Sequence, residues 1–127
     1  MCGIIGYCGD GNAGEVVLQG LKALEYRGYD SSGIALADQD GVMSITRSVG
    51  KISALIEKTK NNLITSSCGI GHTRWATHGA VNEVNTHPHT DQFGKVAVVH
   101  NGIIENFEEL KENFPLEIFT SETDTEV

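Results

Sequence analysis

Hydrophobic positions divide the chain into short segments whose spacing changes from strand-like to helical. The β-branched run Gly3 to Cys8 predicts a buried strand that begins almost at the first residue. Val17, Leu21 and Leu24 then recur at the i, i+4, i+7 spacing of one helix face. Gly28 stands where this helix is expected to end. The chain therefore opens with a strand and an amphipathic helix.

A hairpin and several shorter elements are predicted further along. Apolar runs at 34–37 and 42–46 flank Asp38-Gln39-Asp40-Gly41, which has the turn chemistry of a hairpin with Gly where φ is positive. The other predicted elements are a helix marked by Ile52, Leu55, Ile56 and Leu63, interior strands at 68–70 and 96–99, a helix marked by Phe107, Leu110 and Phe114, and a strand at 116–119. These elements are compatible with an α+β domain but do not select one fold.

Composition and charge narrow the class of protein. The 127 residues are 39% hydrophobic, which fits one globular domain. There are 17 Asp and Glu against 9 Lys and Arg, a net charge of −8, and no basic cluster. This balance disfavours a nucleic-acid or anionic-membrane partner. No apolar run approaches the roughly 20 residues that span a bilayer, so we predict a cytoplasmic protein.

The cysteines do not form a disulfide pattern. Cys2, Cys8 and Cys68 are odd in number and lack CxxC spacing, and a reducing cytoplasm disfavours disulfides. We expect Cys8 and Cys68 to be inert thiols in the core.

All five histidines fall in one stretch of the chain: His72, His78, His87, His89 and His100. A zinc site is one interpretation, because His87-Pro88-His89 could bring two imidazoles close together. No HExxH or CxxC motif supports it, and histidines that orient loops are the stronger interpretation. We therefore expect neither a metal nor another cofactor.

Cys2 has chemistry of its own. A small penultimate side chain permits removal of Met1, after which one residue carries both a thiol and an α-amine. The amine, with a reference pKa of about 7.7 to 8.0, can take a proton from the attacking thiol. Cys2 is then a nucleophile with its own base. A small apolar Cys at a strand start is the simpler interpretation of Cys2 by itself.

Several blocks of residues, in order, resemble the class II glutamine amidotransferases. The blocks are Met1-Cys2-Gly3-Ile4, 26–33 (YRGYDSSG), 72–79 (HTRWATHG), 85–89 (NTHPH), 100–106 (HNGIIEN) and 120–124 (TSETD). They are most similar to the branch of that family that passes ammonia from glutamine to fructose 6-phosphate, forming glucosamine 6-phosphate. The resemblance implies the N-terminal-nucleophile fold, an αββα sandwich with antiparallel sheets, of which this chain would supply the front part.

The resemblance also implies a site for L-glutamine. It assigns Arg74 to the substrate carboxylate and Asp124 to the α-ammonium, as a zwitterion requires. Cys2 would attack the side-chain amide, and the Asn101 side chain with the Gly102 backbone N–H would hold the oxyanion. Hydrolysis of the thioester would then give glutamate. Residues implied to line the pocket are Trp75, Thr77, His78 and His87.

Members of the family continue beyond these blocks, with a sugar-phosphate isomerase region, and form homodimers. We therefore expect residues 1–127 to be the N-terminal part of a glutaminase domain, with the continuation and the isomerase domains absent. Thr123 to Glu126 has the T-x-x-E form of a capping box, which predicts a helix start there. Two alternatives stay open: a catalytically inactive fragment and, more remotely, a histidine-based metal-binding module.

Overall fold

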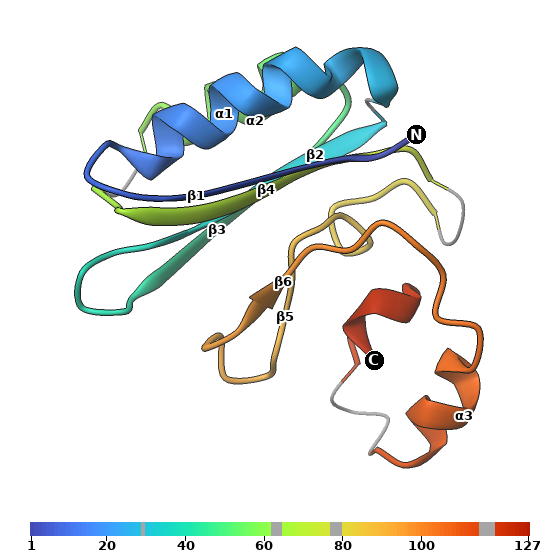
Figure 1. Cartoon of the computed structure of the whole chain (residues 1–127). Helices are drawn as coiled ribbons and strands as arrows, with labels where there is room; N and C mark the ends of the chain where they lie inside the picture. The colour runs from blue at the N-terminus through green and yellow to red at the C-terminus, as the bar shows by residue number, and fades with distance from the viewer. Residues whose placement is uncertain (29, 62–64, 77–79, 115–118) are drawn as a thin grey trace.

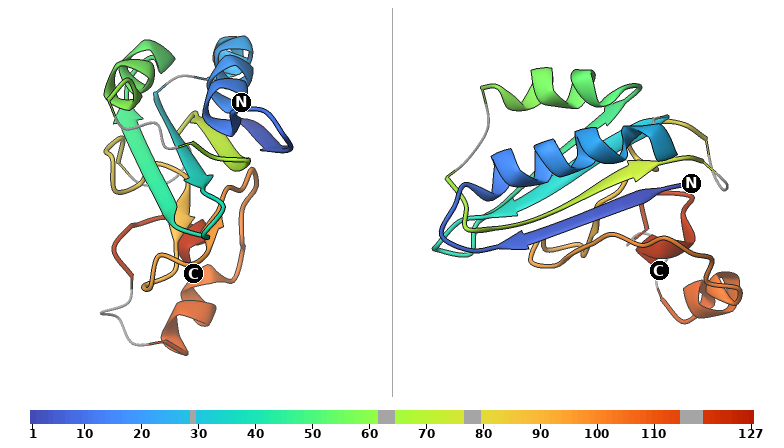
Figure 2. Two further views of the ribbon diagram at one scale, coloured as in Figure 1. Left: turned by 90° about the vertical axis from the view of Figure 1, so that its left-hand side faces the viewer. Right: turned by 45° about the horizontal axis from the view of Figure 1, so that its top comes forward.

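The computed structural model describes residues 1–28, 30–61, 65–76, 80–114 and 119–127. Helices α1 and α2 lie on one face of a four-stranded sheet, and the segments that follow β4 lie across its other face (Figure 1). Figure 2 shows the same layering from two further directions. The architecture is α+β with antiparallel pairing, as predicted.

The larger sheet has the strand order β1-β4-β2-β3. Its strands are β1 (Gly3–Cys8), β2 (Ser31–Ala37), β3 (Met43–Val49) and β4 (Cys68–Arg74). The predicted hairpin is confirmed, and Gly41 takes the expected positive φ of 79°. The first strand has the predicted bounds, but the prediction that it is buried is wrong. Burial alternates along β1: Ile5 and Tyr7 pack against the core, whereas Ile4, which points to the opposite face of the sheet, is 40% exposed.

The main core lies between the helices and this sheet. Helix α1 (Ala13–Leu24) continues into the short 3-10 helix η1 (Glu25–Arg27), which ends at Gly28 as predicted. Helix α2 (Ile52–Thr59) starts where its Ile52 N–H donates to the Glu25 carboxylate at 3.0 Å. The buried apolar cluster comprises Ala13, Val17, Leu18, Leu21, Ile34, Leu36, Ile52 and Leu55. Leu63 lies outside the described residues.

The second half of the chain has less regular structure. Strands β5 (His89–Thr90) and β6 (Ala97–Val98) form a short antiparallel pair, followed by helix α3 (Phe107–Glu112) and the 3-10 helix η3 (Asp124–Glu126). The predicted interior strand at 96–99 is shorter and largely exposed, since in the described residues β6 pairs only with β5. A strand was also predicted at 116–119, and residues 116–118 lie outside the described part of the chain.

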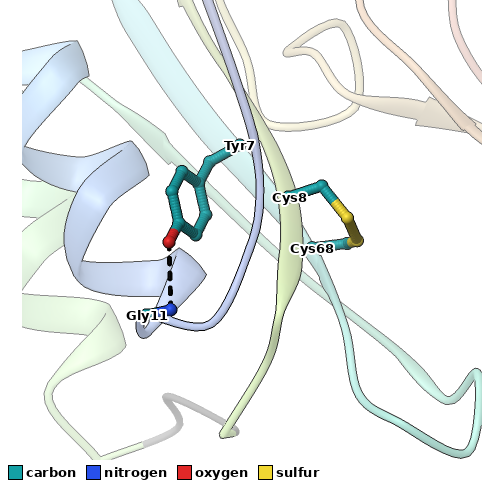
Figure 3. The surroundings of a disulfide bond; sticks show 4 residues. All are labelled: Tyr7, Cys8, Gly11 and Cys68. Atoms are coloured by element: carbon teal, nitrogen blue, oxygen red, sulfur yellow. Dashed lines mark hydrogen bonds between the residues drawn. A yellow bond between two sulfur atoms is a disulfide. The ribbon is translucent and has the colours of Figure 1, made fainter.

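Cys8 and Cys68 form a disulfide, which corrects the expectation of two separate core thiols (Figure 3). The two residues are register partners at the ends of β1 and β4, with a Cα–Cα distance of 4.2 Å. Cys8 is exposed and Cys68 only partly buried. Spacing along the chain could not show this pairing, because 60 residues separate the two cysteines.

No helix in the described part of the chain has the length and apolar character needed to cross a membrane.

Candidate functional site

A cavity of about 520 Å³ opens where the start of β1, the end of β4 and the segments around residues 100 and 124 converge. Its size is typical of small-molecule sites. Seven of the residues predicted from sequence line it: Cys2, Arg74, Trp75, His87, Asn101, Gly102 and Asp124. Thr77 and His78, also predicted, lie outside the described residues. The fold therefore brings together positions from both ends of the chain.

Cys2 is placed by the pairing of β1 with β4. Gly3 is opposite Thr73 in the register, and the Gly3 N–H donates to Thr73 Oγ1 at 3.1 Å. This pairing sets Cys2 beside Trp75, whose backbone N–H donates to the Cys2 sulfur at 3.2 Å. The thiol is 3.6 Å from the Trp75 carbonyl oxygen, and the Cys2 side chain is only partly buried. The sulfur is thus oriented by backbone groups yet open to the cavity.

Among the described residues that line the cavity, Arg74 is a buried cation and Asp124 is a buried anion. Arg74, at the end of β4, is 4% exposed, and its Nη1 donates to the Ala80 carbonyl at 3.3 Å. Asp124, at the start of η3, is 8% exposed and accepts a hydrogen bond from the Ile104 N–H at 2.7 Å. Buried opposite charges in one cavity suit a zwitterionic ligand, because the low local dielectric strengthens each contact.

A polar clamp joins the segments that carry these two charges. The Asn85 amide donates to the Glu122 carboxylate at 2.8 Å, and the Glu122 N–H donates to Asn85 Oδ1 at 2.9 Å. The Ala80 N–H also donates to Glu122 at 3.2 Å, while Asn85 donates to the Ala80 carbonyl at 3.0 Å. These bonds lower the pKa of Glu122. The Asn85 and Glu122 side chains therefore connect Ala80, whose carbonyl accepts from Arg74, to the segment that precedes Asp124.

Asn101 and Gly102 lie on an exposed segment that borders the cavity. Gly102 is packed against the preceding loop: a Cβ there would stand 2.6 Å from His100 Nε2. A larger residue at position 102 would have to displace the His100 ring. Asn101 Oδ1 is 2.7 Å from His72 Nε2.

Three buried imidazoles extend inward from the cavity. His72 and His87 stack with ring centroids 4.2 Å apart, and His87 meets His89 edge to face at 4.6 Å. Burial lowers the pKa of His72 to about 4, of His87 to about 2 and of His89 to about 4. The three rings are therefore neutral at physiological pH. Within the described ranges, which omit His78, no group of three or more His, Cys, Asp or Glu side chains could hold a metal ion.

The predicted capping box has different contacts from those expected. Thr123 precedes η3 but makes no capping bond; its hydroxyl bonds to His89 Nε2 at 2.8 Å and to Ser121 Oγ at 2.9 Å. The Glu126 carboxylate instead accepts from the backbone N–H groups of Ser121, at 2.6 Å, and Thr120, at 2.9 Å. The predicted helix start is confirmed, since Thr123 is the N-cap residue of η3, but the predicted capping-box bonds are wrong because tertiary partners compete for the Thr123 hydroxyl. These bonds still fix the turn that carries the adjacent carboxylate.

Sequence reasoning missed some residues that line the cavity. They include Met1, Arg27, His72, His100, Thr123 and Thr125. His72 and His100 could have been found from their positions, since each is the first residue of a block that carries the family resemblance.

The chain belongs to the glutamine amidotransferase domain family, which matches residues 45–127. It is 55% identical to the glutamine–fructose-6-phosphate aminotransferase (isomerizing) of Pyrococcus horikoshii and 54% identical to that of Thermus thermophilus, each over 129 aligned residues. These alignments cover 100% of this chain and 21% of each relative. The chain thus spans about a fifth of the length of these relatives.

Solved structures show the same fold. The glutamine phosphoribosylpyrophosphate amidotransferase from B. subtilis, complexed with ADP and GMP, matches with a TM-score of 0.79 and 27% identity. A structure described as the allosteric regulatory enzyme of purine biosynthesis matches with a TM-score of 0.81 and 27% identity. Each match covers 99% of this chain and 28% of the other. The predicted N-terminal-nucleophile α+β fold is confirmed.

Proposed function

We propose that this chain binds L-glutamine and releases ammonia from its side-chain amide through a thioester on Cys2. The proposal rests on the observation that one cavity is lined by all of Cys2, Arg74, Asn101, Gly102 and Asp124. Membership of the glutamine amidotransferase domain family supports the choice of substrate.

Arg74 and Asp124 select the amino-acid end of the substrate. Glutamine has an α-carboxylate, an α-ammonium and a neutral side-chain amide, so its site needs one cation and one anion. The Arg74 guanidinium can bind both carboxylate oxygens, and the buried Asp124 carboxylate can accept from the ammonium. With both charges bound, the side-chain amide extends toward Cys2.

The reaction then proceeds at the sulfur. The Cys2 Sγ forms a bond to the amide carbon, and its proton moves to a neutral amine. The carbonyl oxygen becomes an oxyanion, which the Asn101 amide and the Gly102 N–H stabilise. As the tetrahedral species collapses, the C–N bond breaks and the nitrogen leaves as ammonia with the returned proton. Water then cleaves the thioester to glutamate and restores the thiol.

The amine in this scheme is that of Cys2, so Met1 must be removed. Met1 lines the cavity and its amine donates to the Arg27 carbonyl at 2.5 Å. Its removal enlarges the entrance and leaves the new α-amine on the same residue as the nucleophile. The amine is thereby the nearest available base.

We extend the proposal to the larger protein. The similarity to glutamine–fructose-6-phosphate aminotransferases supports residues 1–127 as the N-terminal part of a glutaminase domain whose ammonia passes to fructose 6-phosphate, forming glucosamine 6-phosphate. A C-terminal sugar-phosphate isomerase domain, homodimerisation and a cytoplasmic location belong to the same proposal.

Intact-mass spectrometry of the purified chain, before and after treatment with 6-diazo-5-oxo-norleucine, tests the proposed chemistry. This electrophile has the two α charges of glutamine, so it labels Cys2 only if the site binds them. We expect a chain that lacks Met1 and carries one adduct, mapped to Cys2. Excess L-glutamine should slow the labelling.

Two variants serve as controls. Cys2→Ser should abolish the adduct, and Arg74→Met should slow labelling because the carboxylate contact is lost. A trimmed chain whose Cys2 stays unmodified would overturn the claim of activity for residues 1–127. An adduct formed equally fast with Arg74→Met would contradict the assignment of the carboxylate site.

A further inference from the structure

We propose that His72 is a positioning residue for the oxyanion site: its Nε2–H donates to Asn101 Oδ1 and thereby turns the Asn101 amide nitrogen toward the cavity. This inference rests on the proposed function, in which that nitrogen stabilises the oxyanion. It adds a residue to which the sequence resemblance gives no role.

The contact between His72 and Asn101 is short, and His72 lies in the buried centre of the sheet. His72 Nε2 and Asn101 Oδ1 are 2.7 Å apart. His72 lies on β4, between β1 and β2 in the sheet, and is 1% exposed. Its register partners are Ile4 and Gly33, and its ring stacks on His87. Pairing on both sides of β4 and stacking on His87 therefore restrict the movement of the imidazole.

Asn101 needs such a support because its own surroundings do not fix it. Asn101 is exposed, and its segment is neither helix nor strand. A primary amide can present either its oxygen or its nitrogen to the cavity by a half-turn about its last torsion. If the oxygen faced the developing oxyanion, the two would repel. A donor on the opposite side of the amide decides between the two orientations.

The protonation state of His72 makes it that donor. Burial lowers its pKa to about 4, although hydrogen bonding to Asn101 and to the His100 backbone favours the charged ring. One nitrogen of the neutral ring carries the hydrogen. Within the described chain Nδ1 is buried and has no hydrogen-bond partner. An N–H orphaned there would be costlier than an orphaned acceptor, which favours the hydrogen on Nε2.

The enzymatic test compares two substitutions at His72. His72→Leu removes the donor, so kcat for glutamine hydrolysis should fall by about 10- to 100-fold, less than the 10²–10³-fold effect of losing an oxyanion donor outright. The KM should stay within about twofold, because the α-carboxylate and α-ammonium contacts are untouched. His72→Gln places an amide N–H near the position of Nε2 and should restore most of kcat.

His89→Leu is the matched control. It also removes a buried imidazole from the stack, but His89 bonds to Thr123 and not to Asn101. It should lower the melting temperature and, through the Thr123 turn that carries Asp124, raise KM, while kcat stays within about twofold of wild type. If His72→Leu does not fold, His72→Phe, which keeps a ring beside His87 but has no N–H donor, replaces it. In the Asn101→Ala chain, losing the donor at His72 should have no further effect on kcat.

Two kinetic results would overturn the proposal. One is a folded His72→Gln chain as impaired as a folded His72→Leu chain. The other is a His72→Leu chain whose only change is a higher KM.

NMR gives a readout that does not depend on activity. Two-bond ¹⁵N–¹H correlations of the imidazole report which nitrogen of His72 carries the hydrogen. Nε2–H supports the positioning contact even if the chain proves inactive, in which case only the proposed function fails. A hydrogen on Nδ1 of His72 would overturn the contact, whatever the activity.

Discussion

Asp124 offers a direct test of the proposal that the cavity binds an amino acid. Asp124→Asn changes the charge but almost nothing else. The side chain is 8% exposed, and one of its oxygens accepts from the Ile104 N–H at 2.7 Å. Asparagine can keep an oxygen there, while its NH₂ faces the Thr125 hydroxyl, which is 3.4 Å from the other carboxylate oxygen. We therefore expect the fold to persist and only the interaction with the α-ammonium to be lost.

The size of the loss follows from the burial of this carboxylate. A hydrogen bond to a charged group contributes about 1.5–3 kcal/mol. Since each 1.4 kcal/mol is tenfold in affinity, the dissociation constant for glutamine should rise roughly 10- to 150-fold. The effect belongs at the upper end if bound ligand excludes water from the cavity.

Calorimetric titration of L-glutamine into the Cys2→Ser chain measures this affinity without turnover. The same titration with 5-amino-5-oxopentanoate, which lacks the α-amine, isolates the ammonium contact. Asp124→Asn should weaken glutamine strongly and this analogue little. Asp91→Asn is the matched control, because the Asp91 carboxylate also accepts backbone N–H groups, from Lys95 at 2.7 Å and Val96 at 2.8 Å, but lies outside the cavity. Equal weakening of both ligands, or none of either, would refute the assignment of Asp124.

Three further predictions concern the scaffold. Gly33→Ala should destabilise the chain by more than about 1 kcal/mol, the size of a moderate overpacking defect, because the added Cβ would overlap the His87 carbonyl. Denaturant unfolding measures this loss, and an unchanged midpoint would contradict the packing. Stability should fall as pH drops from about 6.5 toward about 4, because the three buried histidines have lowered pKa values and the unfolded chain binds protons first. Melts at stepped pH should reveal this loss, and a flat profile would count against neutral rings. Alkylation without reductant should modify Cys2 only, and labelling of Cys8 or Cys68 as well would exclude the disulfide.

Sequence by itself determined several local elements and the family. The spacing of Val17 and Leu21 defined a helix face, and the Asp38-to-Gly41 turn defined the hairpin, because both depend on residues close together in the chain. The blocks around Cys2, Arg74 and Asn101 identified the family. Such signals need no knowledge of tertiary contacts.

Tertiary structure decided everything that depends on partners distant in sequence. The burial of β1 was misjudged because α1 and α2 cover only one face of the sheet, which leaves alternate residues of the strand exposed. The Cys8–Cys68 disulfide follows from the register of β1 on β4. The Thr123 hydroxyl does not make the expected capping bond, because it bonds to His89 instead. The contact between His72 and Asn101 likewise joins residues that local patterns treat separately. Hydrophobic spacing constrains a segment and its immediate neighbours, whereas register and polar partners are fixed only when distant segments pack together.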